Sequence, residues 1–395
     1  MNQFRRIYLL LFAAILSVQM IYAKSQTGNN ANGGFYTNGT QLLDANGNEF
    51  IMRGVNYSWC WQYRNGDGNT ADDVIPAAKR QGANVIRIQL SDGGNSFWKK
   101  PSASELNNLI QLCKDNKLIV IFNTHDETGS NNVDGLERAA NLWISMKDIL
   151  NANRAYVLVN ISNEWYGNWE SAPWADGYAK VIPMMRNAGI KNTLVVDCAG
   201  YGQFPTSIQQ AGNRILNSDS DKNLIFSMHL YDCFPTAKKV DEAIDKALSA
   251  GAPAIVGEFA YYHKGKNVAW QEILDQCQAK NVGYLGWSWT GNGDGTEACD
   301  MFGSYDDSNM KENGKCIILG RNGIKETSKE CSVFSGIKND STTGIENIGN
   351  NDNNLEENEP AKIYTLSGQR VFQFDNNRRQ MYIIKKGKKT IKMIR

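Results

Sequence analysis

Two glutamates stand where apolar, strand-like runs end. Glu164 follows the run Val157-Leu-Val-Asn-Ile-Ser-Asn163, and Glu258 closes the run that begins at Ala254. Cleavage of a glycosidic bond needs such a pair, because one carboxylic acid protonates the leaving oxygen while a second carboxylate stabilises or traps the oxocarbenium-like centre. A single glutamate after a strand more simply caps that strand or pairs with a surface lysine. Two of them, with Asn163 before one and aromatic residues after both, predict a glycosidase.

The elements that must position this pair alternate along the chain. Eight apolar runs have strand character: Phe50–Asn56, Asn84–Leu90, Leu118–Asn123, Tyr156–Ser162, Thr193–Asp197, Leu224–His229, Ala254–Glu258 and Gly283–Trp287. Helical patterns lie between them at Thr70–Gln81, Ser104–Asn116, Gly135–Leu150, Trp174–Asn187, Lys238–Ala250 and Val268–Lys280. This alternation predicts parallel strands joined by right-handed crossovers. We therefore expect an α/β fold, a (β/α)8 TIM barrel, in which the carboxyl ends of the strands surround the active site.

Further polar and aromatic residues fall at the same strand ends. They are Arg87, His125, Asn163, His229, Tyr231 and Trp287. Arg87 lies within a strand, where an inward guanidinium could hold a carboxylate by bidentate hydrogen bonds and keep it ionised. One such residue alone is more often structural, but their convergence on one barrel face predicts an active site. A doubly wound open sheet is the structural alternative, yet it predicts a phosphate-binding glycine loop after the first strand, and Gly54-Val-Asn-Tyr57 is not one.

Length and composition set further bounds. The 395 residues fit one barrel of about 250 residues or more with appendages, and a net charge of +1 gives no reason to expect nucleic acid as a partner. Residues 1–23 combine Arg5 and Arg6 with an apolar stretch over Ile7–Leu16 and a small residue at Ala23. This pattern predicts a secretory signal peptide cleaved after Ala23, and hence a secreted or cell-surface protein. A transmembrane helix is the alternative, but the apolar stretch is short for a span, and no membrane span is expected in the mature protein.

The cysteines leave their pairing open. Export permits disulfides among the eight cysteines, whose connectivity the sequence alone does not identify. Cys113 and Cys277 lie in helical patterns, and we expect them to be free core thiols. Neither a Cys-x-x-Cys nor a His-x-x-His spacing occurs, and the chain has three histidines, so we expect no zinc and no metal among the site residues; a structural calcium stays open.

The composition changes after Phe334. Residues 335–360 are rich in Asn, Asp, Glu, Gly and Thr, which predicts a flexible linker between a catalytic domain at 24–334 and a C-terminal module at 361–395. The module has alternating strand character and ends in a lysine-rich segment, so we expect two or three β-strands with a basic hairpin. An accessory β-module is favoured over a basic nucleic-acid patch, because the lysines flank a turn in an exported chain.

Several motifs carry a resemblance to a known family. They are Arg53-Gly-Val-Asn56, Arg87, Thr124-His125-Asp126, Asn163-Glu164-Trp165, His229-Leu-Tyr231, Gly257-Glu258-Phe259 and Trp287-Ser-Trp289. Together they resemble glycoside hydrolase family 5, a family of retaining (β/α)8 enzymes. Longer stretches are similar to the bacterial endo-β-1,4-mannanases of that family: Ala175-Asp-Gly-Tyr178, Gly200-Tyr-Gly-Gln-Phe-Pro205 and Gly323-Ile-Lys-Glu-Thr-Ser-Lys329. The resemblance covers roughly residues 34–334.

This resemblance implies a role for each site residue. It makes Glu164 the general acid/base and Glu258 the nucleophile of a double displacement on β-mannan, which needs no cofactor. Asn163 would then bind the sugar 2-hydroxyl. Arg87 and Tyr231 would orient and tune the nucleophile. The subsite of the cleaved sugar would be lined by His125 and His229, with Trp287 as its hydrophobic floor. Trp165 would be a further substrate-binding or tuning residue.

Two loops depart from the family pattern. The related mannanases have His-x-His after Gly-Val-Asn, whereas this chain has Tyr57-Ser-Trp59, so we expect Trp59 or Trp61 to stack on a sugar instead. The sixth loop has Asp232-Cys233 where Glu-Tyr is more typical.

Mannan, glucomannan or galactomannan is the substrate that the resemblance favours. An endo-β-1,4-glucanase is the nearest alternative, because mannose and glucose differ only at C2. A catalytically silent glycan-binding barrel or an adhesive surface protein would have no need of both glutamates. The tail, with Ile363-Tyr-Thr-Leu-Ser-Gly-Gln-Arg-Val371, resembles the sorting domains of type IX secretion, which implies a contact with the outer-membrane secretion machinery.

Overall fold

The structure is a computed structural model of the 395-residue chain. It describes residues 33–62 and 70–336 with their side chains, and the backbone of four short segments at 362–365, 370–371, 381–386 and 389–394. The predicted signal peptide and all but the first two residues of the predicted linker lie outside the described residues. The chain divides into two compact units, residues 1–340 and 341–395, and each is considered by itself.

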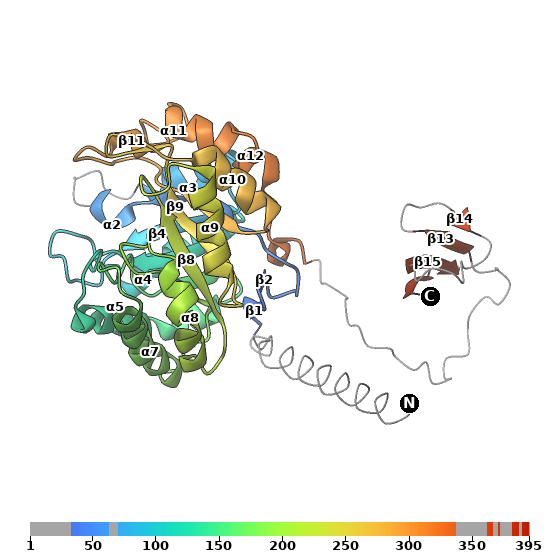
Figure 1. Ribbon diagram of the computed structural model, residues 1–395, viewed down its shortest axis with the longest axis horizontal. Helices are drawn as coiled ribbons and strands as arrows, with labels where there is room; N and C mark the ends of the chain where they lie inside the picture. The colour runs from blue at the N-terminus through green and yellow to red at the C-terminus, as the bar shows by residue number, and fades with distance from the viewer. Residues whose placement is uncertain are drawn as a thin grey trace, which may run out of the picture. The chain divides into compact units, whose positions relative to one another are not determined.

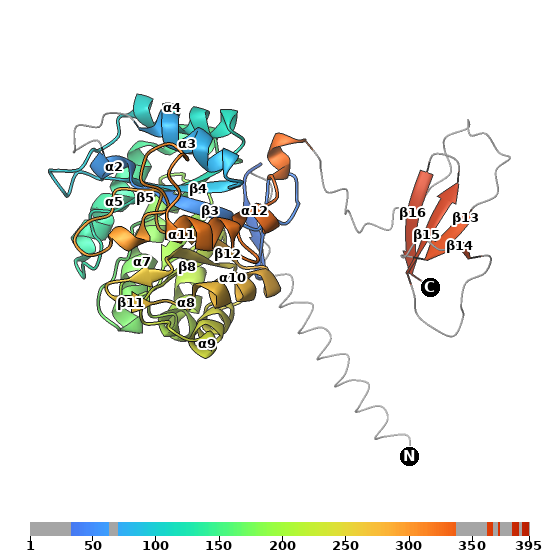
Figure 2. The same cartoon turned by 90° about the horizontal axis from the view of Figure 1, so that it is seen from above.

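The first unit is built on a closed barrel of parallel strands, shown with its surrounding helices in Figures 1 and 2. Its strands are β3 (Arg53–Tyr57), β4 (Val85–Leu90), β5 (Ile119–Thr124), β6 (Val157–Asn160), β7 (Leu194–Asp197), β8 (Leu224–Leu230), β9 (Ala254–Phe259) and β12 (Gly283–Gly286). Around the barrel they pair in the order β12-β3-β4-β5-β6-β7-β8-β9. The predicted (β/α)8 barrel is confirmed, and each strand overlaps one of the eight predicted runs.

Helices cover the outside of the barrel. The longer ones are α3 (Ala71–Arg80), α4 (Ala103–Asp115), α5 (Val133–Ser145), α6 (Lys147–Ala152), α7 (Ser171–Asn187), α8 (Thr206–Ser218), α9 (Ala237–Leu248) and α10 (Trp270–Ala279). Several begin at residues suited to a helix start: Ser102 and Glu105 form a capping box on α4, and Thr236 caps α9. The sequence did not predict α8, because this helix is mostly polar and presents only a narrow face to the barrel, through Ile208 and Ile215 among its buried residues.

Short elements complete the unit. They are β1 (Tyr36–Asn38), β2 (Gln41–Leu43), α2 (Trp59–Gln62), β10 (Tyr262–His263), β11 (Lys266–Asn267), η3 (Glu297–Cys299), α11 (Glu312–Gly314), η4 (Lys315–Leu319), α12 (Ile324–Thr327) and η5 (Ser332–Phe334). The pair β1–β2 and the pair β10–β11 are antiparallel hairpins. None of the helices in the described part of the chain is long and apolar enough to span a bilayer.

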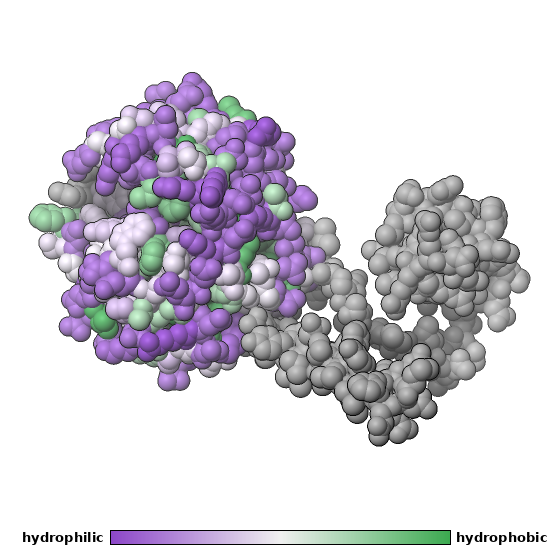
Figure 3. Space-filling model, in the orientation of Figure 1, coloured by the Kyte–Doolittle hydropathy of each residue, from purple (hydrophilic) through white to green (hydrophobic). Residues whose placement is uncertain are grey.

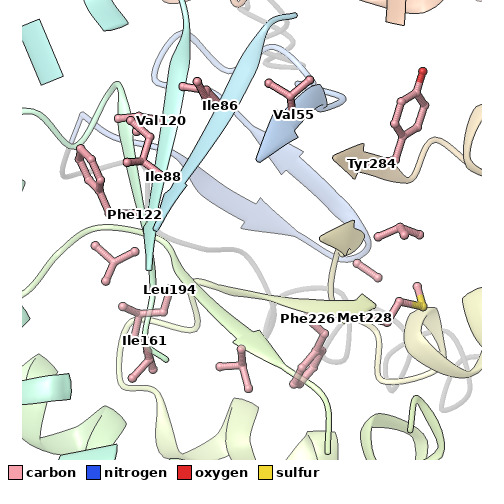
Figure 4. Close-up of a cluster of buried hydrophobic side chains, with 14 of the residues drawn as sticks. Val55, Ile86, Ile88, Val120, Phe122, Ile161, Leu194, Phe226, Met228 and Tyr284 are labelled. Carbon is pink, nitrogen blue, oxygen red and sulfur yellow. The ribbon is translucent and has the colours of Figure 1, made fainter. Parts of the chain in front are cut away.

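The strand period of two decides which side chains enter the barrel. Outward residues such as Ile86 and Phe122 pack in the large cluster shown in part in Figure 4, whereas Val85 and Ile121 belong to a second apolar cluster. Two residues beyond Val85 comes Arg87, so the same face of β4 changes from apolar to charged toward the carboxyl end. The barrel interior therefore has an apolar lower layer and a polar upper layer.

Apolar residues are correspondingly scattered on the outside. On the face of the first unit seen in Figure 3, hydrophilic residues dominate and hydrophobic ones form small groups. This is the distribution expected when most large apolar side chains are packed inside.

The eight cysteines all lie in the described residues, and none of them forms a disulfide. Seven are buried and Cys233 is half-buried. Burial raises the pKa of Cys113 and of Cys277 above the ordinary thiol value, so both are protonated at neutral pH. The prediction that these two are free core thiols is confirmed, and the other six are also unpaired.

The second unit is a small antiparallel sheet. It contains β13 (Lys362–Thr365), β14 (Arg370–Val371), β15 (Met381–Lys386) and β16 (Lys389–Ile394), in the order β14-β13-β15-β16. The two-residue connection between Lys386 and Lys389 makes β15 and β16 a hairpin. The tail is thus β-rich as predicted, with four strands where two or three were expected.

Candidate active site

The carboxyl ends of the strands bring together the residues singled out in the sequence. Arg87 lies in β4, His229 in β8 and Glu258 in β9, while Glu164 follows β6 by four residues. All four are buried, with Glu164 the most accessible at 9 %. Residues separated by up to 171 positions in the chain therefore meet at one end of the barrel.

Arg87 is the centre of the polar upper layer. Its Nη1 donates to Glu258 Oε1 at 2.7 Å and to Asn56 Oδ1 at 2.9 Å, and its Nη2 donates to Asn163 Oδ1 at 2.7 Å. Nε and Nη2 both donate to Asn160 Oδ1, at 3.0 and 2.8 Å. A buried guanidinium with amide oxygens on several sides is held in one position. That position fixes Glu258 and Asn163 relative to each other.

Glu258 accepts a hydrogen bond at each oxygen. Arg87 binds Oε1, and the Tyr231 hydroxyl donates to Oε2 at 2.8 Å. Burial raises the pKa of Glu258 above the ordinary glutamate value and Glu164 adds to the rise, whereas His229, Arg87 and the Tyr231 hydrogen bond lower it. The contacts that stabilise a carboxylate are thus concentrated on Glu258.

Glu164 is held differently. Its backbone is in the left-handed region at φ +47°, and its N–H donates to Asp197 Oδ2 at 3.0 Å. Burial, followed by the nearby Asp197 carboxylate, raises the pKa of Glu164 to about 8, although Arg87 and Lys264 oppose the rise. At neutral pH Glu164 therefore carries a proton, as a general acid must.

His229 lies beside both carboxyl groups. Its Nδ1 is 2.7 Å from Glu164 Oε1 and 3.4 Å from Glu258 Oε2. One oxygen of each glutamate and a nitrogen of His229 all lie within 4.8 Å of one another. A separation of about 5 Å between carboxyl groups is typical of retaining glycosidases, and inverting enzymes need more room for a water molecule.

The same three side chains are of types that bind metal ions. Both oxygens of Glu258, however, already accept hydrogen bonds from Arg87 and Tyr231, and a divalent cation would have to displace the guanidinium charge at 2.7 Å. This donor set fits a hydrogen-bonded carboxyl pair better than it fits a metal centre.

A cleft of about 860 Å³ opens above the two glutamates. One wall is aromatic: Trp287 stacks on His125 with ring centres 5.6 Å apart and planes 15° apart, and Trp61 lies 5.1 Å from His125. Trp98 joins them at 5.5 Å from Trp61. Burial, and then the charge of Arg87, lowers the pKa of His125 well below its ordinary value, so this wall is uncharged at neutral pH.

Three sequence predictions need correction. Trp59 does not line the cleft: helix α2 begins at this residue and turns its side chain into the core, where it is 1 % exposed, while Trp61 faces the cleft. Trp165 is fully buried, with its Nε1 donating to the carbonyl of Asn132. His229 is also fully buried, so it lies behind the carboxyl pair and is not part of the cleft wall.

The structure adds residues that the sequence did not single out. Asp197 ends β7, and its carboxylate lies 3.5 Å from Arg87 Nη2 and accepts from Asn160. An acid at the end of a predicted strand was the same signal that marked Glu258. Trp98, Tyr201, Gln203 and Lys264 also line the cleft. They lie in loops, where no strand pattern marked them.

The unusual sixth loop has a structural explanation. Asp232 pairs with His263 Nδ1 at 2.7 Å and with Lys266 at 3.3 Å. The His263 ring stacks on Tyr231 with centres 4.4 Å apart. Asp232 therefore anchors the β10–β11 hairpin beside the residue that binds Glu258.

The fold and the paired carboxyl groups define a glycoside hydrolase of the (β/α)8 class. Residues 43–293 match the model of the cellulase family, glycosyl hydrolase family 5, and the chain belongs to this family. It is 40 % identical over 303 residues to a mannan endo-1,4-beta-mannosidase of Salipaludibacillus agaradhaerens, covering 76 % of this chain and 96 % of that protein. It is 38 % identical over 310 residues to a mannan endo-1,4-beta-mannosidase of Streptomyces lividans, covering 78 % of this chain and 79 % of the relative.

Solved structures agree with these relatives. The mannohexaose complex of the Thermomonospora fusca beta-mannanase superposes with a TM-score of 0.70 at 35 % identity. The match covers 76 % of this chain and 99 % of that one. The likeness therefore extends over nearly the whole of the solved mannanase.

Proposed function

We propose that this protein is an endo-acting β-1,4-mannanase that cleaves mannan, glucomannan or galactomannan with retention of configuration. The observation that carries the chemistry is the carboxyl pair within 4.8 Å, with the proton on Glu164 and the cationic partner on Glu258. The substrate class is supported by the two relatives named mannan endo-1,4-beta-mannosidase, at 38 and 40 % identity.

In the first step the Glu258 carboxylate attacks the anomeric carbon, and Glu164 gives its proton to the leaving glycosidic oxygen. The glycosidic bond breaks and a covalent glycosyl ester forms on Glu258. In the second step Glu164, now ionised, takes a proton from water, whose oxygen attacks the anomeric carbon and releases Glu258. His229 holds the Glu164 carboxyl toward Glu258 through the 2.7 Å contact.

Other residues position the sugar. Asn163 has its Oδ1 bound by Arg87, and its Nδ2 donates to Thr128 at 2.9 Å. Nδ2 also lies 3.4 Å from His125 Nε2, and we propose that the sugar 2-hydroxyl replaces this long contact as the acceptor of the second Nδ2 hydrogen. Trp287 forms the floor on which the cleaved sugar stacks. The ring is held in place because its Nε1 donates to Asn292 Oδ1 at 2.8 Å.

The test is reducing-sugar release by the protein lacking residues 1–23 on linear mannan, glucomannan and carboxymethylcellulose, with Glu258→Gln as the blank. Release from linear mannan and little from carboxymethylcellulose is the expected result. The reverse would make the protein a glucanase. No release from any of the three would contradict the proposed activity.

We also propose that the protein is exported and that its tail directs it to the cell surface through the type IX machinery. The signal-peptide pattern of residues 1–23 and the strand motif of residues 363–371 support this route. Deletion of residues 336–395 should then leave a fully active protein in the periplasm. Surface delivery that is unchanged by the deletion would overturn the role of the tail.

A further inference from the structure

A second groove, of about 400 Å³, borders the catalytic cleft on the side of β6, β7 and β8. Gln203 lines both the cleft and this groove, so the two adjoin at this residue. The groove is lined by aromatic and charged side chains together, among them Trp169, Phe204, Phe234, Glu242 and Lys246.

Two exposed aromatic residues lead from the cleft to the groove. Tyr201, 46 % exposed, lies in the cleft wall, and Trp169, 51 % exposed, lies in the groove. They are two of four large apolar side chains that are exposed within residues 33–62 and 70–336. An exposed indole or phenol ring offers a flat apolar face with a polar edge, which suits the apolar face of a pyranose.

Both rings rest on glycines. A Cβ at Gly129 would overlap the Tyr201 ring, and a Cβ at Gly200 would lie 3.0 Å from the Trp169 ring. Trp169 also packs against Phe204, with ring centres 5.3 Å apart. Each ring is thus supported from beneath while much of it remains exposed, so binding would immobilise little additional side-chain freedom.

We propose that the groove at Trp169 is a remote binding site for the β-1,4-linked hexopyranose chain, on the leaving-group side of the cleaved bond. The proposal rests on the proposed function. Glu164, the proposed acid, contacts the leaving oxygen, and the segment that begins at Glu164 carries Trp169. The aromatic wall is carried by the segments that follow the other four strands, β12, β3, β4 and β5, and it consists of Trp287, Trp61, Trp98 and His125. A polymer whose cleaved sugar stacks on Trp287 therefore continues past Glu164 and Tyr201 toward Trp169.

The experiment compares kcat/KM for soluble glucomannan with kcat/KM for mannotetraose, in the protein lacking residues 1–23. Trp169→Ala should lower the ratio of polymer to oligosaccharide roughly three- to tenfold, the size expected for one lost aromatic contact. Trp169→Tyr keeps a ring and should restore most of the ratio. Leu319→Ala truncates an equally exposed apolar residue, 55 % exposed, that lies in neither the cleft nor the groove, and should leave the ratio unchanged.

A binding measurement keeps the proposal independent of turnover. In the Glu258→Gln background, migration through gels containing glucomannan should be retarded less when Trp169→Ala is added. An unchanged ratio together with unchanged retardation would overturn the groove site. So would an equal loss on both substrates, or a Trp169-dependent dimer in size-exclusion chromatography. A parent protein that releases no sugar from any mannan would instead overturn the proposed function itself.

Discussion

The two halves of the barrel rim differ in what they present to the cleft. Loops after β12, β3, β4 and β5 supply the aromatic wall, whose one titratable ring, His125, is neutral. The loops and strand ends of β6 to β9 supply Glu164, Asp197, His229 and Glu258. One half therefore supplies the aromatic wall of the cleft, and the other supplies the titratable groups beside the cleaved bond.

Arg87 joins the halves. It comes from β4, on the aromatic side, and reaches across to Glu258 and to Asp197. The guanidinium opposes the pKa rise of both glutamates, together with His229 at Glu258 and Lys264 at Glu164. The wall on which the cleaved sugar would stack and the groups that control protons therefore come from separate loops, so variants of the wall and variants of the charged groups should have separable effects.

The largest effects are expected from the two glutamates, and they should differ from each other. Glu258→Gln removes the proposed nucleophile, so turnover of every glycoside should fall by several orders of magnitude. Glu164→Gln removes the proposed acid, which a dinitrophenyl glycoside does not need because its leaving group departs without a proton. Glu164→Gln should therefore still release dinitrophenolate in a rapid first turnover, measured by stopped-flow absorbance.

Glu164→Ala and Glu258→Ala serve as matched controls for the amide side chains. A burst from the Glu258 variant and none from the Glu164 variant would show that Glu164 is the nucleophile and Glu258 the acid.

The next largest effect is expected on the aromatic half. Trp287→Ala removes an apolar platform worth about 1.5–3 kcal/mol, so kcat/KM on mannan should fall roughly 10- to 100-fold. Because the wall is uncharged, the pH at which activity is lost on the alkaline side should not move. Trp287→Phe should lose less, since it keeps a ring and gives up the hydrogen bond to Asn292. A shifted pH profile in Trp287→Ala would show that the aromatic wall also affects the protonation of Glu164.

How much of this the sequence could predict depends on the element. Apolar runs marked all eight barrel strands. The sequence could also predict that Arg87 and Glu258 meet, because the carboxyl ends of barrel strands converge independently of the loop conformations. Helix α8 was missed because few of its residues face the core. Asp197 was overlooked although it ends a predicted strand, as Glu258 does.

Loop side chains could not be placed in the same way. Trp59 and Trp61 are two residues apart, and a turn of helix after β3 buries the first while the second faces the cleft. His229 follows an irregularity in the pairing of β8 with β9, between Met228 and His229, and lies behind the carboxyl pair. Such positions depend on the path of the backbone, which apolar patterning does not encode.

Asp197→Asn should move the pH profile without removing a catalytic residue. The amide keeps an oxygen that can accept the Glu164 N–H but loses the negative charge that raises the pKa of Glu164. As the proposed acid, Glu164 can donate only when protonated, so activity should be lost as pH rises through its pKa, near 8 in the unchanged protein. With that pKa lowered, the alkaline limb of kcat/KM should shift to lower pH.

The control for this shift is another buried aspartate. Asp219 pairs with Arg186 at 2.8 Å, away from the cleft, and Asp219→Asn should lower the melting temperature while leaving the alkaline limb in place. An alkaline limb that stays fixed or moves upward in Asp197→Asn would show that Asp197 does not control the proton on Glu164.

The smallest effect is expected from Lys264 on the β10–β11 hairpin, and its sign is opposite. Its positive charge lowers the pKa of Glu164, so Lys264→Gln should move the alkaline limb of kcat/KM slightly upward. The side chain is exposed, and added salt should shrink the difference between variant and parent, since charges in solvent are screened over about 10 Å at 0.1 M. Lys266→Gln removes the same charge from the same hairpin, but that charge is already paired with Asp232, so the limb should move less. A downward shift in Lys264→Gln, or equal shifts in both lysine variants, would mean that the hairpin does not act on Glu164 through the Lys264 charge.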